Sequence, residues 1–521
     1  MKTTLIRKAL IFTALSVIFT AVASLASAQE FRATINGNVV DPNGAAVAGA
    51  TVTVKNNATN ITVSVTTNGE GSYVIPFIVP GTYTISATSN GFKTSTRENI
   101  ELKVDDRLPL DFKLEIGAAA EVSIIADTEL LERGSVTIGT SVSQRQIEEL
   151  PLAEGAPYVL ATQAPGMVYT GDPNFQGPTA NGNLAGFRSN GTQGNQVNGS
   201  GGNVINLDGS PNLAYDGQVA FTPPSAATRE FKVQTNSFDA QMGYTAGATV
   251  NVATKSGTNK FNGEAYFYDR DKSRTANNFF NNKAGLPKPE RKYNRYGGVI
   301  TGPIFKDKTF FLFSYERQKD NVAQTTTYSV PTVLMRTGNF SEILATTPIY
   351  DPATAFMGNS TCGLTGTLNR VCRTAFAGNI IPLARMYAPA LAFMQYFPLP
   401  NLPGVSNNFI TDQNLIRPYR SFMGRIDHNI NDKNTIFGKY YHSRNTEDRY
   451  NLTMEPDSIF RGFENRRNNG ASATWTSAFS SNLYFDLRGS WGKFELIRFQ
   501  DGQPTAGELG FTGIPTDRQS N

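Results

Sequence analysis

The chain has 521 residues, with 39% hydrophobic and 11% aromatic residues and a mean hydropathy of -0.30. This composition excludes a bundle of membrane-spanning helices, but a transmembrane barrel stays open, because its strands are hydrophobic on only one face. The formal charge of +4, set against 47 basic and 43 acidic residues, indicates no nucleic-acid partner.

The first 28 residues are typical of a secretory signal peptide. Lys2, Arg7 and Lys8 supply the positive start, residues 9–25 form an apolar run, and Ala26-Ser27-Ala28 is a small-residue cleavage site. The alternative is an uncleaved anchor helix, which the hydroxyl residues inside the run disfavour. We therefore expect the mature chain to leave the cytoplasm.

Residues 31–117 are predicted to form a small β-sandwich. Short runs of alternating apolar residues are separated by turn sequences such as Asp41-Pro42-Asn43-Gly44 and Pro80-Gly81. Several short strands at close spacing with turns between them favour a sandwich.

Residues 118–255 combine short strands with one short helix and long polar loops. A strand is predicted at Glu121, Val122, Ser123, Ile124 and Ile125. A helix is predicted in the segment from Ser141 to Leu152, which begins with an N-cap residue type and spaces its apolar residues helically.

A turn is predicted at Leu207, Asp208 and Gly209. Asp208 is expected to accept hydrogen bonds within its own turn, and Gly209 to take a positive φ. A polar loop of this kind could also face a ligand.

After Lys260 the chain becomes a series of aromatic, amphipathic strands. In the segment that starts at Lys308, for example, Phe311, Phe313 and Tyr315 share one face. A soluble sandwich or propeller would also contain aromatic strands. The charged residues opposite the aromatic faces and the unequal loop lengths instead favour an outer-membrane barrel, with one long loop over residues 319–419.

Two stretches resemble a known family. The sequence TKSGTN at 254–259, which follows EFKVQTNSFDAQMG and precedes an aromatic strand, resembles the junction of plug and barrel in TonB-dependent outer-membrane receptors. The stretch GSYVIPFIVPGTYTISATSNGFK is similar to the carboxypeptidase-regulatory-like fold, and together they indicate the Oar-like subfamily. The resemblance implies a mostly β chain with an N-terminal β-sandwich (31–117), an α+β plug domain (118–255) and the first part of a transmembrane antiparallel β-barrel (256–521).

The resemblance also implies partners. The TonB-type energy-transducing complex of the inner membrane would grip the segment from Glu121 to Ile125, although a plain linker strand is the alternative for these residues. Outer-membrane lipid would surround the barrel, and the external ligand would be an oligosaccharide, a peptide or a metal chelate. We expect the ligand surface in residues 190–216 and 362–408, including a carbohydrate-binding function. The other hypothesis for the whole protein is a surface adhesion or structural protein without transport.

Enzyme chemistry is not expected. The only two histidines, His428 and His442, are too few for a zinc peptidase, and we predict no catalytic, metal or cofactor residues. Cys362 and Cys372 are the only cysteines, and in an exported protein two nearby cysteines usually pair, so we predict a disulfide.

The long loop and the chain's end complete the predictions. Residues 383–397 are expected to form a short surface helix. Only six to eight strands can be drawn after Lys260, whereas plugged transporters have about 22. We therefore expect the 521 residues to be an N-terminal fragment.

Overall fold

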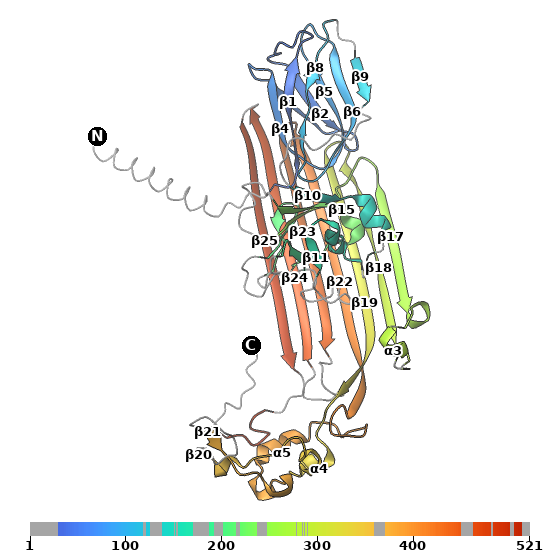
Figure 1. Cartoon of the computed structure of the whole chain (residues 1–521). Coiled ribbons are helices and arrows are strands. Elements are labelled where there is room, and N and C mark those ends of the chain that lie inside the picture. The colour runs from blue at the N-terminus through green and yellow to red at the C-terminus, as the bar shows by residue number, and fades with distance from the viewer. Residues whose placement is uncertain are drawn as a thin grey trace, which may run out of the picture.

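The computed structural model describes residues 30–117, 121–125, 138–150, 152, 155–169, 187–191, 202–214, 219–236, 247–277, 279–283, 285, 287–288, 290–358, 370–449, 462–480, 483–500 and 505–512. Strands dominate, in an N-terminal sandwich, an inner sheet and a long wall sheet (Figure 1). The predicted mostly β fold class is thus confirmed. In the part of the chain just defined, no helix has the length and apolar character to cross a membrane.

Two sheets form the N-terminal sandwich. One has the order β4-β1-β7, with β8 also paired to β1, and the other has the order β3-β2-β5-β6-β9. Alternate side chains of several strands fill the space between the sheets, as Tyr83, Ile85 and Ala87 of β5 do. The bounds are β1 (Ala33–Val40), β2 (Thr51–Asn56), β3 (Thr62–Thr66), β4 (Ser72–Ile78), β5 (Gly81–Thr88), β6 (Thr94–Leu102), β7 (Arg107–Pro109), β8 (Phe112–Lys113) and β9 (Glu121–Ile125).

The inner sheet has the order β10-β15-β16-β13-β14. Its strands are β10 (Ile138–Val142), β13 (Val204–Leu207), β14 (Ser210–Pro211), β15 (Thr228–Asn236) and β16 (Thr249–Thr254). Around it lie α2 (Gln144–Glu149), the 3-10 helices η2 (Pro157–Gln163) and η5 (Ser225–Ala227), and the hairpin of β11 (Met167–Tyr169) and β12 (Phe187–Ser189).

The observed helix α2 begins later and ends earlier than the predicted segment of residues 141–152. Ser141 lies in β10, where it pairs with Lys232, so it is not available as a cap. Ser143 takes that role with a full capping box, in which it and Gln146 bond each other's backbone and side chain.

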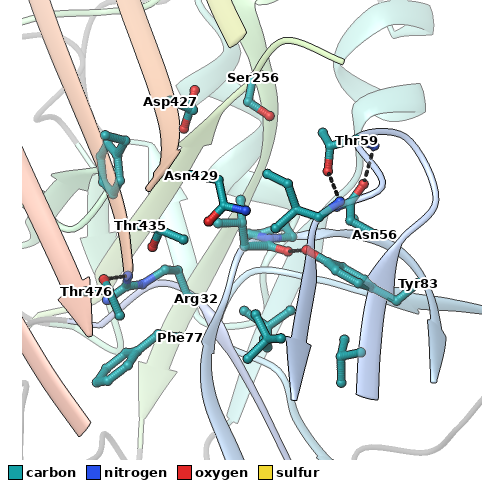
Figure 2. Close-up of a pocket in the computed structure, with 18 of the residues that line it drawn as sticks. Arg32, Asn56, Thr59, Phe77, Tyr83, Ser256, Asp427, Asn429, Thr435 and Thr476 are labelled. Carbon is teal, nitrogen blue, oxygen red and sulfur yellow. Dashed lines mark hydrogen bonds between the residues drawn. The ribbon is translucent and has the colours of Figure 1, made fainter. Parts of the chain in front are cut away.

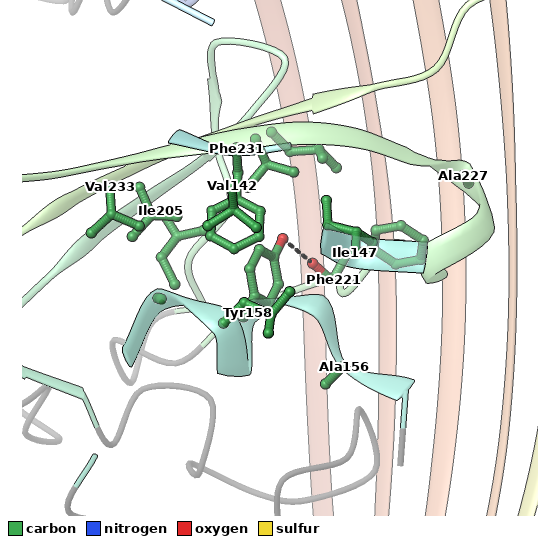
Figure 3. Close-up of a cluster of buried hydrophobic side chains, with 14 of the residues drawn as sticks. Val142, Ile147, Ala156, Tyr158, Ile205, Phe221, Ala227, Phe231 and Val233 are labelled. Carbon is green, nitrogen blue, oxygen red and sulfur yellow. Dashed lines mark hydrogen bonds between the residues drawn. The ribbon is translucent and has the colours of Figure 1, made fainter. Parts of the chain in front are cut away.

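The core of the inner domain lies between its sheet and the two helices (Figure 3). Ile147 of α2 and Tyr158 of η2 are buried against Phe231 of β15, and the rings of Tyr158 and Phe231 meet edge to face. The Tyr158 hydroxyl donates to the Phe221 carbonyl at 3.4 Å. The one polar atom of this buried ring therefore has a partner within the domain.

The wall sheet contains seven antiparallel strands in simple chain order. They are β17 (Asn262–Asp271), β18 (Arg291–Phe305), β19 (Thr309–Tyr328), β22 (Phe409–Asn431), β23 (Asn434–Arg449), β24 (Gly462–Ser480) and β25 (Leu483–Gln500), with η7 (Lys272–Arg274) and α3 (Phe279–Lys283) between β17 and β18. Turns of two or three residues join β18 to β19 and β22 to β23 at the end beside the sandwich (Figure 1). The opposite end carries the longer connections, which is the asymmetry expected of an outer-membrane sheet.

The two faces of the wall sheet differ, as the strand pattern predicts. On β19, Phe310, Leu312 and Glu316 are buried on the face toward the inner domain, whereas Phe313 and Tyr315 are exposed on the opposite face. The aromatic, outward face is therefore the one that suits lipid.

The longest connection is shorter than the expected loop of 319–419. The β19–β22 ladder continues to the pair Tyr328 and Phe409. The backbone groups of polar residues form the hydrogen bonds of a hairpin as readily as those of apolar residues. Residues 329–358 and 370–408 form a lobe at its tip, called the external lobe below, at the end of the wall sheet opposite the sandwich (Figure 1). Its elements are α4 (Val333–Arg336), η8 (Ser341–Ile343), η9 (Pro352–Thr354), β20 (Phe356–Gly358), β21 (Arg370–Cys372), η11 (Ala377–Asn379), η12 (Leu383–Arg385) and α5 (Ala388–Met394).

The expected helix of 383–397 is two separate helices in the structure. The single turn η12 ends at Arg385, and Tyr387 takes an extended conformation as the N-cap of α5. Pro389 follows in the first turn of α5, a place where its missing N–H costs no hydrogen bond. The continuous helix was therefore wrong.

Candidate functional site: a charged interface between the inner sheet and the wall

The predicted turn at Leu207, Asp208 and Gly209 joins β13 to β14. Leu207 pairs with Ser210 across the hairpin, and both central residues have positive φ, 47° at Asp208 and 72° at Gly209. Aspartate and glycine are among the residue types that adopt this conformation most readily. The parallel partner of β13 is β16, so the turn is held beside Thr254 at the end of β16.

The Asp208 carboxylate is fully buried and is used outside its own turn. Thr254 donates to it twice, from the backbone N–H at 2.8 Å and from the hydroxyl at 2.9 Å. From the wall, Lys439 Nζ lies 3.1 Å from Oδ2 and Arg425 Nη1 lies 3.2 Å from Oδ1. We expected Asp208 to accept within its turn, and instead its oxygens join the inner sheet to β22 and β23.

Both wall cations have further partners. Lys439 also donates to the Leu207 carbonyl, and Arg425 pairs with Asp427 at 2.7 Å on its own strand. The Arg425 guanidinium lies 4.6 Å from the centre of the Phe437 ring, which adds a cation–π contact. The side chains of Arg425 and Lys439 are each 1% exposed, so these charges are stabilised by their partners and not by water.

Burial alone would raise the pKa of the Asp208 carboxyl. The nearby Lys439 ammonium and Arg425 guanidinium, with the Thr254 N–H, outweigh that effect and hold its pKa below the usual range. The carboxylate is therefore ionised at neutral pH, and the three side chains form a buried ionic cluster.

A second buried ion pair lies farther along the same face of the wall. Arg295 Nε of β18 is 2.7 Å from a Glu316 oxygen of β19, and the Tyr266 hydroxyl donates to the same carboxylate at 2.6 Å. Arg295 also donates to the Ser225 hydroxyl of the inner domain at 3.1 Å. Gly155, with φ of 76°, lies against this guanidinium, and a Cβ there would collide with it.

The N-terminal sandwich contacts both the wall and the inner sheet. At the wall, Arg32 pairs with Asp486 at 2.7 Å and donates to the Thr476 hydroxyl at 2.6 Å. At its other side, the Val104 N–H donates to a Glu230 carboxylate oxygen at 2.8 Å. Burial, the largest influence on Glu230, raises the pKa of that carboxyl to about 7.

A cavity of about 420 Å³ lies between the sandwich and the wall (Figure 2). Arg32 and Phe77 line one part of it, where the guanidinium lies 4.6 Å from the ring centre. Phe77 has a φ of 65°, an unusual conformation for an aromatic residue, at the bulge where β4 shifts register against β1. The cavity marks the place where the sandwich meets the short turn between β22 and β23, since Asp432 and Lys433 line it.

The structure places the other predicted residues as follows. Glu121 to Ile125 form β9, which pairs with β6 of the sandwich and belongs to that sheet. Cys372 is disulfide-bonded, and Cys362 lies outside the described residues. Of the predicted ligand surfaces, residues 192–201, 215–218 and 359–369 also lie outside them.

The two histidines lie on the wall strands. The His428 Nδ1 is 2.8 Å from the Thr309 hydroxyl, and the His442 Nδ1 is 2.8 Å from the Asn469 side-chain oxygen. Within the described ranges, no three histidine, cysteine or acidic side chains are grouped as metal ligands would be.

Sequence reasoning missed the two cations that pair with Asp208. Arg425 and Lys439 lie on strands that the sequence did predict, and each occupies the buried face of its strand. The sequence did place a basic residue on the buried face of each of these two consecutive strands. A buried basic side chain needs an acidic partner, and this was the signal that could have been used. Nothing in the sequence indicated that the anion was Asp208.

Two segments of the chain match known protein families. Residues 253–521, just over half of the chain, match the family described as outer membrane beta barrel domain, and residues 34–115 match the carboxypeptidase regulatory-like domain. The chain is 25% identical over 298 residues to the TonB-dependent transporter Oar of Myxococcus xanthus, which is 54% of this chain and 26% of that protein.

Two solved structures are similar over most of the chain. The outer membrane transporter YddB from Escherichia coli has a TM-score of 0.43 and 11% identity, with 70% of this chain and 40% of that one covered. The siderophore receptor PirA from Acinetobacter baumannii has a TM-score of 0.39 and 14% identity, covering 69% and 40%.

The chain belongs to the outer membrane beta barrel domain family. The resemblance to Oar-like TonB-dependent receptors with a carboxypeptidase regulatory-like domain is confirmed, and so is the outer-membrane location. The chain spans about a quarter of the length of the curated relative that it matches. The relative and the two structures named above are transporters or receptors and not enzymes.

Proposed function

We propose that this protein is a TonB-dependent outer-membrane receptor that binds an external ligand and imports it with energy from the inner membrane. In this proposal residues 118–255 are the plug, residues 256–521 belong to the barrel, and residues 31–117 are a periplasmic domain. The observation that carries it is the ionic cluster of Asp208, Arg425 and Lys439, by which the inner sheet is attached to the wall.

A plug has to be held firmly and yet separate without unfolding the barrel. Among the described strands, the inner sheet and the wall sheet share no backbone ladder, and buried side chains make their contacts. Buried ion pairs define one docked position, while the cost of desolvating the charges offsets most of their attraction. Water that enters as the plug moves would solvate Asp208 and its partners again, so the attachment is specific and reversible.

The external lobe supports ligand binding at the outer end. Asp351 and Arg385 form a two-point ion pair within it, with one contact at 2.6 Å, and Arg336 donates to the Met394 carbonyl at 2.9 Å. Large apolar side chains nevertheless remain exposed, such as Leu383, which is 67% exposed. We propose residues 362–408 of this lobe and residues 190–216 of the plug as the ligand surface, for an oligosaccharide, a peptide or a metal chelate.

The test replaces residues 121–125, the proposed energy-coupling segment, by a glycine-serine stretch of equal length. Labelled ferric chelates, oligosaccharides and peptides are presented to cells with the native or altered receptor, with and without a protonophore. We expect one class to accumulate in native cells only, to lose accumulation with the protonophore, and to keep binding at the surface of cells with the altered receptor.

A matched control replaces residues 402–406 of the external lobe in the same way, which leaves the periplasmic side unchanged. This control should weaken binding and uptake together. If cells with the altered coupling segment behave as native cells do, transport is wrong and the protein is an adhesion or structural protein of the surface.

A further inference from the structure

The cavity between the sandwich and the wall is bounded by three parts of the chain. The sandwich contributes its β2–β3 and β4–β5 turns, the wall contributes the β22–β23 turn, and the inner sheet contributes Arg229 near the start of β15. The volume of about 420 Å³ lies in the range of sites that enclose small molecules. A molecule bound there would touch all three parts at once.

Three irregular strand positions supply side chains to this cavity. Phe77 lies in the bulge of β4. Arg229 lies where the β15–β16 register shifts between Thr228 and Glu230, so it has no partner across that ladder. Asn429 is the last residue of β22 in register with β23 before that ladder shifts too. Such irregularities re-aim side chains and are common beside functional sites, so their meeting at one cavity indicates a binding site.

Asn429 offers a hydrogen-bond acceptor. Its side-chain oxygen is buried, and within the described residues no group donates a hydrogen bond to it. Its backbone N–H donates to the Lys308 carbonyl at 2.8 Å, which holds the residue in place, and Figure 2 shows its side chain among those that line the cavity. A buried polar atom without a partner costs free energy, so a ligand that donates an O–H or N–H here would recover a hydrogen bond.

Arg229 offers a positive charge. Its side chain is partly buried, and among the described residues no hydrogen bond or ion pair joins it to another side chain. Burial raises the pKa of the adjacent Glu230 carboxyl to about 7, so this neighbour is only partly ionised at neutral pH. Arg32 and Asp427, which also line the cavity, have ionic partners of their own. Arg229 is therefore the group that a ligand carboxylate would pair with.

The cavity also presents aromatic surfaces. Besides Phe77, the rings of Tyr83, Phe310 and Phe437 line it. Phe77 holds its ring there at a φ of 65°, a strained conformation of the kind that clusters at functional sites, and the Arg32 guanidinium lies 4.6 Å from the ring centre. An aromatic ligand suits these surroundings, because edge and offset contacts between rings add to the burial of apolar area.

We propose that this cavity binds a small aromatic carboxylic acid that also carries an O–H or N–H donor. The carboxylate pairs with Arg229, the donor bonds the Asn429 side-chain oxygen, and the ring packs against Phe77. The bound acid joins the inner sheet, the wall and the sandwich, so it stabilises the docked position of the N-terminal domain. This site is independent of transport and lies at the end of the wall sheet opposite the external lobe (Figure 1).

Four probes with the same ring test the contacts on the complete native protein in lipid nanodiscs. They are 4-hydroxyphenylacetate, phenylacetate without the hydroxyl, 4-hydroxyphenethyl alcohol without the carboxylate, and tyramine with an ammonium in its place, and calorimetry gives each Kd. We expect 4-hydroxyphenylacetate to bind most tightly, phenylacetate about fivefold and the alcohol at least about tenfold more weakly, and tyramine not at all. Equal affinities of 4-hydroxyphenylacetate and the alcohol, or no binding of any probe at millimolar concentration, would overturn this assignment. The comparison needs no variant, so it does not depend on how a variant folds.

Two variants locate the probe. Arg229→Gln should weaken 4-hydroxyphenylacetate at least about tenfold and leave the alcohol unchanged, and Asn429→Leu should make 4-hydroxyphenylacetate and phenylacetate bind equally. Arg145→Gln is the matched control, because Arg145 lies on α2 of the same domain, outside the cavity, and pairs with Glu149 at 3.0 Å; it should bind as the native protein does. Native affinity for 4-hydroxyphenylacetate in Arg229→Gln, with native thermal unfolding, would place the probe elsewhere and overturn the site.

The effect on docking is measured at a hydrogen bond that crosses the interface. The Asn259 N–H, just before the wall sheet, donates to the Ala58 carbonyl in the β2–β3 turn of the sandwich at 3.1 Å. At about ten times its Kd, 4-hydroxyphenylacetate should slow hydrogen exchange of this amide about tenfold in the native protein and not in Arg229→Gln. Unchanged exchange in the native protein would show that the bound acid does not hold the sandwich in place.

Discussion

Removal of the Asp208 charge gives the most direct measure of how the inner sheet is held to the wall sheet. In Asp208→Asn, the buried ammonium of Lys439 loses its carboxylate, whereas Arg425 keeps Asp427 at 2.7 Å. Breaking one side of a buried ion pair typically costs about 3–5 kcal/mol. We expect the lower end, about 3 kcal/mol, because asparagine can still accept the Thr254 N–H.

The assay is native-state hydrogen exchange of the β16 amides, which reports the free energy of opening the inner sheet. Lys439→Met and the double variant Asp208→Asn with Lys439→Met complete a double-mutant cycle. The double variant leaves no unpaired ammonium. Its loss of stability should therefore be about 2 kcal/mol smaller than the sum of the losses in the two single variants. Glu464→Gln is the matched control, because Glu464 is equally buried but pairs with Arg466 inside the wall at 2.8 Å.

Glu464→Gln should leave exchange in β16 unchanged. A coupling energy below about 0.5 kcal/mol between Asp208 and Lys439 lies within the error of additive behaviour. Such a result would refute the conclusion that this ionic cluster holds the inner sheet to the wall sheet.

Three further outcomes follow from the same contacts. Burial raises the pKa of Glu230 from 4.5 to about 7, so the folded state binds this proton more tightly than the unfolded state does. The free energy of unfolding should therefore fall by about 3 kcal/mol as the pH rises from 4.5 to 7. Glu230→Gln should remove that fall in urea unfolding of the inner domain. Gly209→Ala should cost about 2 kcal/mol, measured by thermal unfolding, since φ is 72° there and the new methyl group would collide with Arg488. Cys372→Ser should make the external lobe easier to cleave by added protease and leave the wall strands protected, because a lost disulfide typically costs about 2–4 kcal/mol; equal cleavage of both proteins would contradict this.

Local patterns were sufficient for much of the fold. Alternation of apolar residues predicted the wall strands and which side chains of β19 share a face, because side chains of a strand point to opposite faces whatever its neighbours are. The Leu207-Asp208-Gly209 turn was predicted for a similar reason, since positive φ suits only a few residue types. These features depend on the residues themselves and their immediate neighbours in the chain.

Other features depend on residues that are distant in the sequence, and only the tertiary structure decided them. Asp208 meets Arg425 and Lys439, more than 200 residues later, because the inner sheet packs against that part of the wall. The strand at Glu121 joined the sandwich, where the open edge of β6 offered backbone partners. A short sequence specifies that a strand or a buried charge needs a partner, but the partner is chosen by the packing of whole sheets.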